Sequence, residues 1–133
     1  MIRPGLALAL WLAIVILVVV NDMIGDTWIA SRVSTRVVEW YKVLVPLPYV
    51  ALLAVVHARR TRGQRWRSAA LLAGLLWAPS TVLLDFLYER LTFGQDAAAF
   101  LDRFAVQWGA PYPILIIALF AAPSVAGRAW NRA

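Results

Sequence analysis

The carboxylic acids at the ends of two apolar segments are the residues of this sequence best suited to chemistry. Asp85 and Glu89 lie four residues apart where a long apolar run ends, so on a helix they would share one face. Asp22 ends another apolar run. Two carboxyl groups in a partly dry pocket can have their pKa values pushed apart, and one then acts as general acid and the other as general base. Asp85 and Asp22 are therefore the candidate catalytic residues, with Glu89 and Glu39 in reserve.

Further polar and aromatic side chains are expected at the same depth as these acids. Counting about 1.5 Å per residue from the arginines at the opposite helix ends puts Asp22, Lys42, Asp85 and Tyr112 about 24–28 Å away, just below one membrane interface. Lys42 is the expected ionic partner of Asp85. The candidate ligand-binding residues are Lys42, Trp40, Tyr88, Trp108, Tyr112, Gln107 and Asn21.

Each of these residues also has a purely structural interpretation. Charged side chains at helix ends are ordinary at a membrane interface, and Trp and Tyr form aromatic belts there. Asp85 and Lys42 would then be an ion pair that only holds helices together. Ionisable groups within a membrane segment nevertheless favour a functional role, so both interpretations stay open.

The elements that must position these residues are apolar helices. Of the 133 residues, 62% are hydrophobic and only 15% are charged, which is too little charge to cover a soluble domain. The sequence predicts a single all-α domain, a bundle of four transmembrane helices, with spans at about 4–22, 37–57, 68–89 and 104–124 and a basic loop at 57–67. The first span is expected to be retained, because no small-residue cleavage site follows it.

The arginines predict the orientation of the bundle. With four spans, both termini and the 57–67 loop share one side, and that side carries eight of the 13 Lys and Arg residues. All 7 Asp and Glu residues fall on the other side. The positive-inside rule makes the first side cytoplasmic. We therefore expect a multi-pass protein of the bacterial inner membrane with both termini in the cytoplasm.

Two features of the spans predict how the helices pack. A stripe of small and polar residues on the third span consists of Gly74, Ala78, Thr81 and Asp85 and ends at Tyr88 and Glu89. Small residues let helices approach closely in lipid, so this stripe is expected to face the bundle interior. Prolines in the second, third and fourth spans predict bent helices, because a proline removes a backbone hydrogen bond within a helix.

Composition and motifs exclude several classes of site. The chain has no Cys and a single His, His57, which rules out disulfides, thiolate metal sites and haems held by two His residues. Neither a metal nor a cofactor is expected. Motifs of serine hydrolases, zinc proteases and phosphate-binding loops are absent. Arginines at a membrane surface account for the net charge of +6, so no nucleic-acid partner is expected.

Three functions remain open, and the sequence does not decide whether the protein is an enzyme. The chain resembles small four-helix bacterial inner-membrane proteins in general, and no motif indicates a particular family. The leading hypothesis is an accessory, assembly or lipid-binding membrane protein. The first alternative is a cofactor-independent acid–base enzyme, of isomerase or cyclase type, on an isoprenoid or lipid substrate. The second is a small transporter that works as an oligomer. Expected partners are membrane lipids, an apolar lipid-like ligand, and further copies of the chain or a larger membrane complex.

Overall fold

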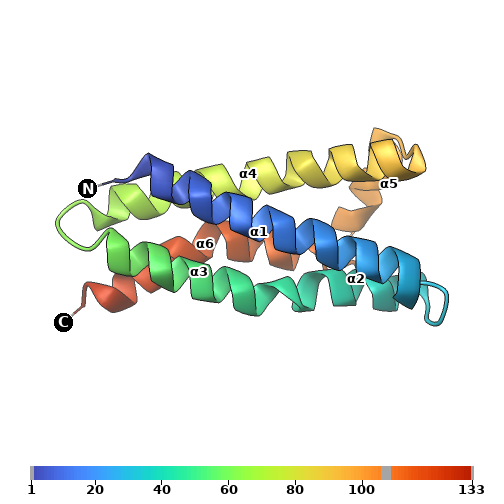
Figure 1. Cartoon of the computed structure of the whole chain (residues 1–133), viewed down its shortest axis with the longest axis horizontal. Helices are drawn as coiled ribbons and strands as arrows, with labels where there is room; N and C mark the ends of the chain where they lie inside the picture. The colour runs from blue at the N-terminus through green and yellow to red at the C-terminus, as the bar shows by residue number, and fades with distance from the viewer. Residues whose placement is uncertain (1, 106–108, 133) are drawn as a thin grey trace.

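The computed structural model describes residues 2–105 and 109–132, and all regular structure within these ranges is helical. Long helices lie side by side along one axis, with both chain ends at the same end of the bundle (Figure 1). The elements are α1 (Pro4–Ile24), the π-helical turn η1 (Gly25–Ile29), α2 (Thr35–Leu44), α3 (Pro46–Arg60), α4 (Trp66–Phe93), α5 (Ala97–Leu101), the 3₁₀ turn η2 (Asp102–Phe104) and α6 (Tyr112–Trp130).

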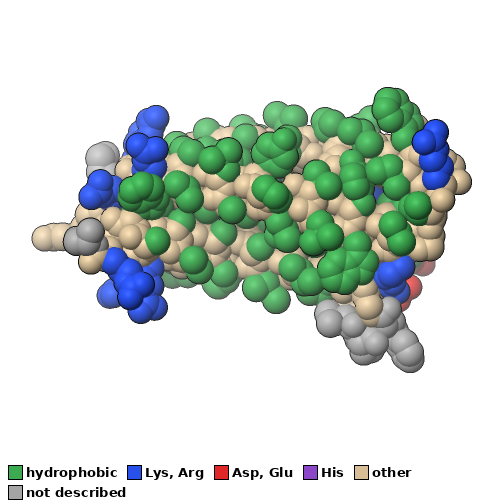
Figure 2. Space-filling view, turned by 90° about the horizontal axis from the view of Figure 1, so that it is seen from below, with side chains coloured by type: hydrophobic (Ala, Val, Ile, Leu, Met, Phe, Trp, Pro, Cys, Tyr) green, Lys and Arg blue, Asp and Glu red, His purple; other side chains and the backbone are tan. Residues whose placement is uncertain are grey.

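Four helical segments of the described chain are long and apolar enough to cross a membrane. They are Pro4–Ile29, Thr35–Arg60, Trp66–Phe93 and Tyr112–Trp130. Large apolar side chains cover the middle of the molecule, and charged side chains gather at its two ends (Figure 2). A surface of this kind matches the hydrocarbon interior of a membrane. The predicted all-α architecture, with four helical segments long and apolar enough to cross a membrane, is confirmed for the described residues.

The second crossing has one break in its helical hydrogen-bond pattern. It is divided at Val45 into α2 and α3, directly before Pro46, whose nitrogen has no hydrogen to donate to the preceding turn. Ser34 begins α2 as its N-cap and accepts a hydrogen bond from the backbone N–H of Val37 at 3.3 Å. Pro79 lies within α4, which continues through it. The predicted bends of the second, third and fourth helices stay a prediction.

The fourth crossing begins later than the sequence suggested. Its helix α6 starts at Tyr112 rather than near residue 104, because residues 97–104 fold into the short elements α5 and η2. Asp96 caps α5 by accepting a hydrogen bond from the backbone N–H of Ala99 at 2.9 Å. A separate short connection therefore lies between the third and fourth crossings.

Glycines allow α4 and α6 to pack closely. A Cβ atom at Gly74 would collide with the backbone carbonyl oxygen of Phe120, so only glycine fits at this point of the α4–α6 contact. The small and polar stripe of α4, which runs from Gly74 through Thr81 to Glu89, is buried. Leu83 and Leu87 on the other side of α4 are exposed. The prediction that the stripe faces the interior is confirmed.

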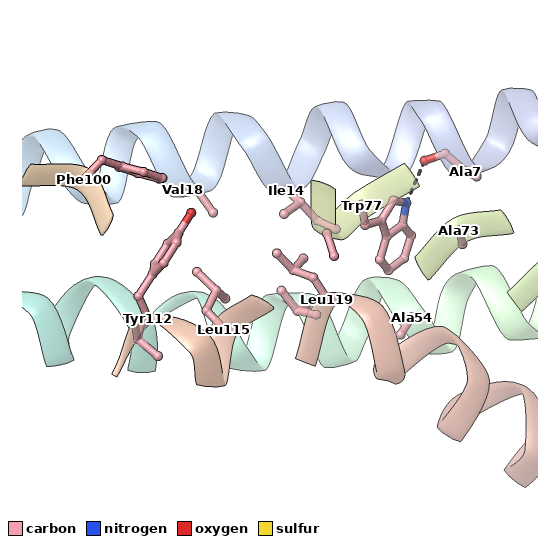
Figure 3. Close-up of a cluster of buried hydrophobic side chains, with 13 residues drawn as sticks. Ala7, Ile14, Val18, Ala54, Ala73, Trp77, Phe100, Tyr112, Leu115 and Leu119 are labelled. Atoms are coloured by element: carbon pink, nitrogen blue, oxygen red, sulfur yellow. Dashed lines mark hydrogen bonds between the residues drawn. The ribbon is translucent and has the colours of Figure 1, made fainter. Parts of the chain in front are cut away.

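The interior between these helices is an apolar core with a few polar cross-links (Figure 3). Trp77 donates its indole N–H to the carbonyl oxygen of Ala7 at 2.9 Å, and Trp11 donates to the Thr81 hydroxyl at 3.2 Å. The His57 ring is completely buried and packs edge-on against Trp77 at 5.9 Å between ring centroids. These contacts fix α1, α3 and α4 relative to one another.

The two ends of the bundle differ in the elements that form them. The termini and the turn between α3 and α4 share one end, where Gly63 donates its backbone N–H to the side-chain oxygen of Asn131 at 3.1 Å. The connection from η1 to α2 and the short helix α5 form the other end (Figure 1). We call these the terminal end and the acidic end, because the acidic side chains of α1 and α4 lie toward the latter.

Candidate functional site

Four acidic side chains from two helices lie inside the bundle toward the acidic end. Asp22 and Asp26 are one helical turn apart on α1 and η1, and Asp85 and Glu89 are one turn apart on α4. Only 1% of Asp22, 1% of Asp85 and 6% of Glu89 is exposed. Because a buried carboxylate is costly unless it is paired or hydrogen-bonded, the partners of these groups determine what the site can do.

Two cationic side chains lie among the acids. Lys42 of α2 places its Nζ atom 2.7 Å from Asp26 Oδ1 and 3.7 Å from Glu89 Oε1. Arg103 of η2 places Nη1 3.7 Å from the same Glu89 oxygen. These six residues, Asp22, Asp26, Lys42, Asp85, Glu89 and Arg103, form what we call the charged cluster. Each membrane-crossing segment before α6 supplies at least one of them.

The short connection before α6 holds Arg103 in place. The Arg103 guanidinium carbon lies 3.9 Å from the centre of the Tyr112 ring and 5.6 Å from that of Phe100. Such contacts with aromatic faces favour the cation. Burial lowers the pKa of Arg103, but Asp85 and the other acidic groups nearby more than offset this and raise it above its ordinary value. Arg103 therefore keeps its positive charge.

Tyrosine hydroxyls supply the remaining hydrogen bonds to the acids. Tyr112 donates to Asp85 Oδ2 at 2.5 Å, and Tyr88 donates to Asp26 Oδ2 at 3.1 Å. The Tyr112 ring rises from the start of α6 toward α1 and packs beside Phe100 (Figure 3). The α6 helix thus joins the cluster through a hydroxyl group rather than a charge.

Several polar atoms in the charged cluster or beside it have no hydrogen-bond partner among the residues that the structure describes. They are buried, and they are Asn21 Nδ2, Asp22 Oδ2, Asp85 Oδ1 and Arg103 Nη1. Native proteins leave few buried polar atoms unpaired, and those that occur often mark a functional site. The donor Asn21 Nδ2 and the acceptor Asp22 Oδ2 belong to adjacent residues of α1.

A cavity of about 310 Å³ lies against the charged cluster. Its charged lining consists of Asp26, Glu39, Glu89 and Asp102 with Lys42 and Arg103. With all these groups ionised, four negative charges face two positive ones. The cavity therefore has an excess of negative charge, and we refer to it as the acidic cavity.

The structure brings together some of the candidate residues and separates others. Asp22, Asn21, Lys42, Asp85, Glu89, Tyr88 and Tyr112 belong to the cluster or flank it. Glu39 lines the acidic cavity but forms its ion pair with Arg36 at 2.6 Å. Trp40 is partly exposed on the outer surface, as expected of an aromatic belt. Gln107 and Trp108 lie outside the described residues.

The prediction that Lys42 is the ionic partner of Asp85 is wrong. Lys42 forms its ion pairs with Asp26 and Glu89, whereas Asp85 accepts its hydrogen bond from Tyr112. Depth along a helix gives no information on rotation about the helix axis, and the rotation of α2 turns Lys42 toward η1 and the last turns of α4.

Sequence reasoning missed two members of the cluster, Asp26 and Arg103. Asp26 follows Asp22 by four residues, the same spacing as Asp85 and Glu89, so this signal was available. Nothing in the sequence marked Arg103, which reaches the site only because α5 and η2 fold back over the bundle end.

The charged lining of the acidic cavity is complementary to a positively charged group. Within the described part of the chain, no group of three or more His, Cys, Asp or Glu residues is arranged to hold a metal ion. Comparison of the chain with protein-family models, curated proteins and solved structures finds no match.

Proposed function

We propose that this protein is a lipid-binding protein of the bacterial inner membrane that holds the polar head of an amphiphile in the acidic cavity. The observation that carries the proposal is a cavity of about 310 Å³ lined by six charged side chains, of which Lys42 and Glu89 are buried, in a molecule whose long sides are apolar. Burying several ionisable groups in such a molecule is costly, and binding of a charged ligand explains why they are kept. The protein acts alone or as an accessory subunit of a larger membrane complex.

The excess of acids indicates the chemistry of the head group. Asp26, Glu39, Glu89 and Asp102 favour a positively charged group such as an ammonium, and Arg103 is available to an accompanying phosphate. A zwitterionic head with both groups, as in phosphatidylethanolamine, satisfies both requirements. We take this head group as the ligand class.

A second, apolar groove supports a ligand with a hydrocarbon tail. It has a volume of about 250 Å³ and is lined by residues of α1, α2 and α3, among them Leu17, Ile24, Tyr41 and Pro46. Asn21, whose Nδ2 atom has no hydrogen-bond partner within the described ranges, lines the same groove. The groove thus offers an apolar surface with one polar contact, one residue away from Asp22.

The proposed orientation puts the acidic cavity on the outer side of the membrane and both termini in the cytoplasm. The clustering of arginines at the terminal end supports it through the positive-inside rule. Because the chain has no Cys, single cysteines at Gln64 and Gln95 can be labelled separately in whole cells with a membrane-impermeant maleimide. Labelling is expected at 95 and not at 64, and the opposite pattern would refute the orientation.

Lipid titration of the purified full chain tests the head-group assignment. A ligand at 100 times its Kd stabilises the folded state by about 2.7 kcal/mol, so phosphatidylethanolamine should raise the unfolding midpoint in detergent more than phosphatidylglycerol does. Glu89→Gln and Asp102→Asn should each reduce this difference. Asp102 is exposed and forms no ion pair with another described residue, so its variant is expected to fold normally.

The matched control is Asp96→Ser, which removes a negative charge at the same end and keeps an N-cap for α5. It should respond to phosphatidylethanolamine like the wild type. Equal stabilisation by both lipids, or an unchanged preference in both cavity variants, would overturn the proposal.

A second candidate function is acid–base catalysis on an isoprenoid or other lipid, and one observation favours it. Asp22 and Asp85 are each 1% exposed and each keeps one oxygen without a hydrogen-bond partner in the described ranges. An acid–base isomerase exchanges substrate C–H protons with solvent. An isoprenoid alcohol incubated with the purified protein in D₂O would then gain deuterium at carbon. The same alcohol incubated with folded Asp85→Asn protein would not. No incorporation by the wild type rejects this candidate.

A further inference from the structure

A basic pocket lies at the terminal end of the bundle, remote from the charged cluster. It has a volume of about 470 Å³ and is lined by Trp66 and Arg67 at the start of α4 and by Ser124 and Arg128 near the end of α6. Neither arginine forms an ion pair with a carboxylate among the residues that the structure describes. Two guanidinium groups that have no carboxylate partner in the described ranges, and one hydroxyl, therefore line the same pocket.

The pocket is built by a glycine and an aromatic ring. A Cβ atom at Gly127 would lie 2.7 Å from Cε3 of Trp66, so only glycine lets the indole lie directly against α6. The guanidinium carbon of Arg67 lies 5.3 Å from the centre of the Trp66 ring, which restrains the Arg67 side chain. Ser124 and Arg128 are four residues apart and share one face of α6.

Toward the middle of the bundle, the faces of α4 and α6 that line the pocket become apolar. On α4, Leu71 and Leu75 follow Arg67 at intervals of four residues, and both are exposed. On α6, the exposed Phe120 lies one turn before Ser124, and Ile117 lies about one turn further. The basic pocket thus continues into an apolar surface along α4 and α6. On the face of the molecule seen in Figure 2, Lys and Arg likewise gather next to the apolar belt at the terminal end.

We propose that this pocket binds the phosphate group of an anionic phospholipid, with its acyl chains lying on the apolar surface of α4 and α6. Arginine binds phosphate through paired, charge-assisted hydrogen bonds, and two arginines with a serine supply enough donors for one phosphate group. The start of α4 adds the positive end of a helix dipole, since no side chain caps it. This site does not depend on the ligand proposed for the acidic cavity.

The test is native mass spectrometry of the purified full chain in detergent with defined mixtures of phosphatidylglycerol and phosphatidylcholine. The wild type is expected to retain one phosphatidylglycerol molecule about thirtyfold more tightly than phosphatidylcholine, given about 1 kcal/mol for each of the two arginines near an anionic headgroup. The double variant Arg67→Gln/Arg128→Gln should lose this preference. The matched control Arg62→Gln/Arg132→Gln loses the same charge at the same end and should keep the preference.

Gly127→Ala is the second variant, because it displaces Trp66 and closes the pocket without any change of charge. It should weaken phosphatidylglycerol retention while circular dichroism shows an unchanged helix content. Equal losses in the pocket and control double variants would overturn the proposal in favour of diffuse surface charge. Displacement of the lipid by millimolar inorganic phosphate would overturn it in favour of a site for a soluble anion.

Discussion

Removal of the Lys42 charge is the most direct test of the charged cluster. Methionine is close to lysine in length and apolar, so Lys42→Met keeps the packing and removes the cation from between Asp26 and Glu89. Asp26 then loses its partner at 2.7 Å, and Glu89 keeps only Arg103, at 3.7 Å. The perturbation is therefore electrostatic.

The expected loss of stability follows from burial and distance. At an effective dielectric constant of about 20, unit charges 2.7 Å apart attract each other by about 6 kcal/mol. Removing lysine also removes the cost of burying it, so the net loss is smaller. Breaking a buried ion pair by removing one partner typically costs about 3–5 kcal/mol. We expect Lys42→Met to lower the free energy of unfolding by an amount in this range.

The assay is equilibrium unfolding in mixed micelles with a double-mutant cycle. Asp26→Asn in the Lys42→Met background should recover part of the loss, because it removes the carboxylate left without its partner, and the coupling energy should be about 1–3 kcal/mol. Lys42→Met stability within about 0.5 kcal/mol of the wild type, the range of ordinary surface substitutions, would refute the view of Lys42 as the central cation.

Two further changes test the contacts around this cluster and in the α4–α6 interface. Tyr112→Phe removes the hydrogen bond to buried Asp85 and should lower the free energy of unfolding by about 1–3 kcal/mol in the same assay. Part of this loss should be recovered in the Asp85→Asn background. An unchanged free energy of unfolding would show that the hydrogen bond does not stabilise the protein. Gly74→Ala should lower the free energy of unfolding by about 1–3 kcal/mol, because the added methyl group meets the carbonyl of Phe120. Gly5→Ala, where the methyl group meets nothing within 4 Å, should be neutral or stabilising, and the same sign for both glycines would contradict this packing.

Properties that depend on one helix at a time could be predicted from the sequence. The spacing of Gly74, Thr81, Asp85 and Glu89 puts them on one face of a helix whatever the neighbours are, and that face is buried. Counting residues from a common end also gives depth, which is why the sequence puts Tyr112 in the same layer as Asp85, to which it donates a hydrogen bond.

Properties that depend on rotation and on irregular connections could not be predicted. Lys42 pairs with Asp26 rather than with Asp85 because of the rotation of α2 about its axis. The sequence of α2 alone does not determine this rotation. Arg103 reaches the cluster because Phe100 is buried and packs against Tyr112, an arrangement of the connection that no helical period encodes. His57 is similar, since its burial against Trp77 follows from how α3 and α4 meet.

The division at Val45 leaves a weak point in the second crossing, next to the charged cluster. Pro46 has no hydrogen for the carbonyl oxygen of Lys42, so the ladder of bonds that stiffens a helix lacks one rung there. Lys42, whose carbonyl oxygen lacks this hydrogen bond, is also the residue whose ammonium pairs with Asp26 and Glu89. The weak point of the helix and the buried cation of the charged cluster therefore fall on the same turn.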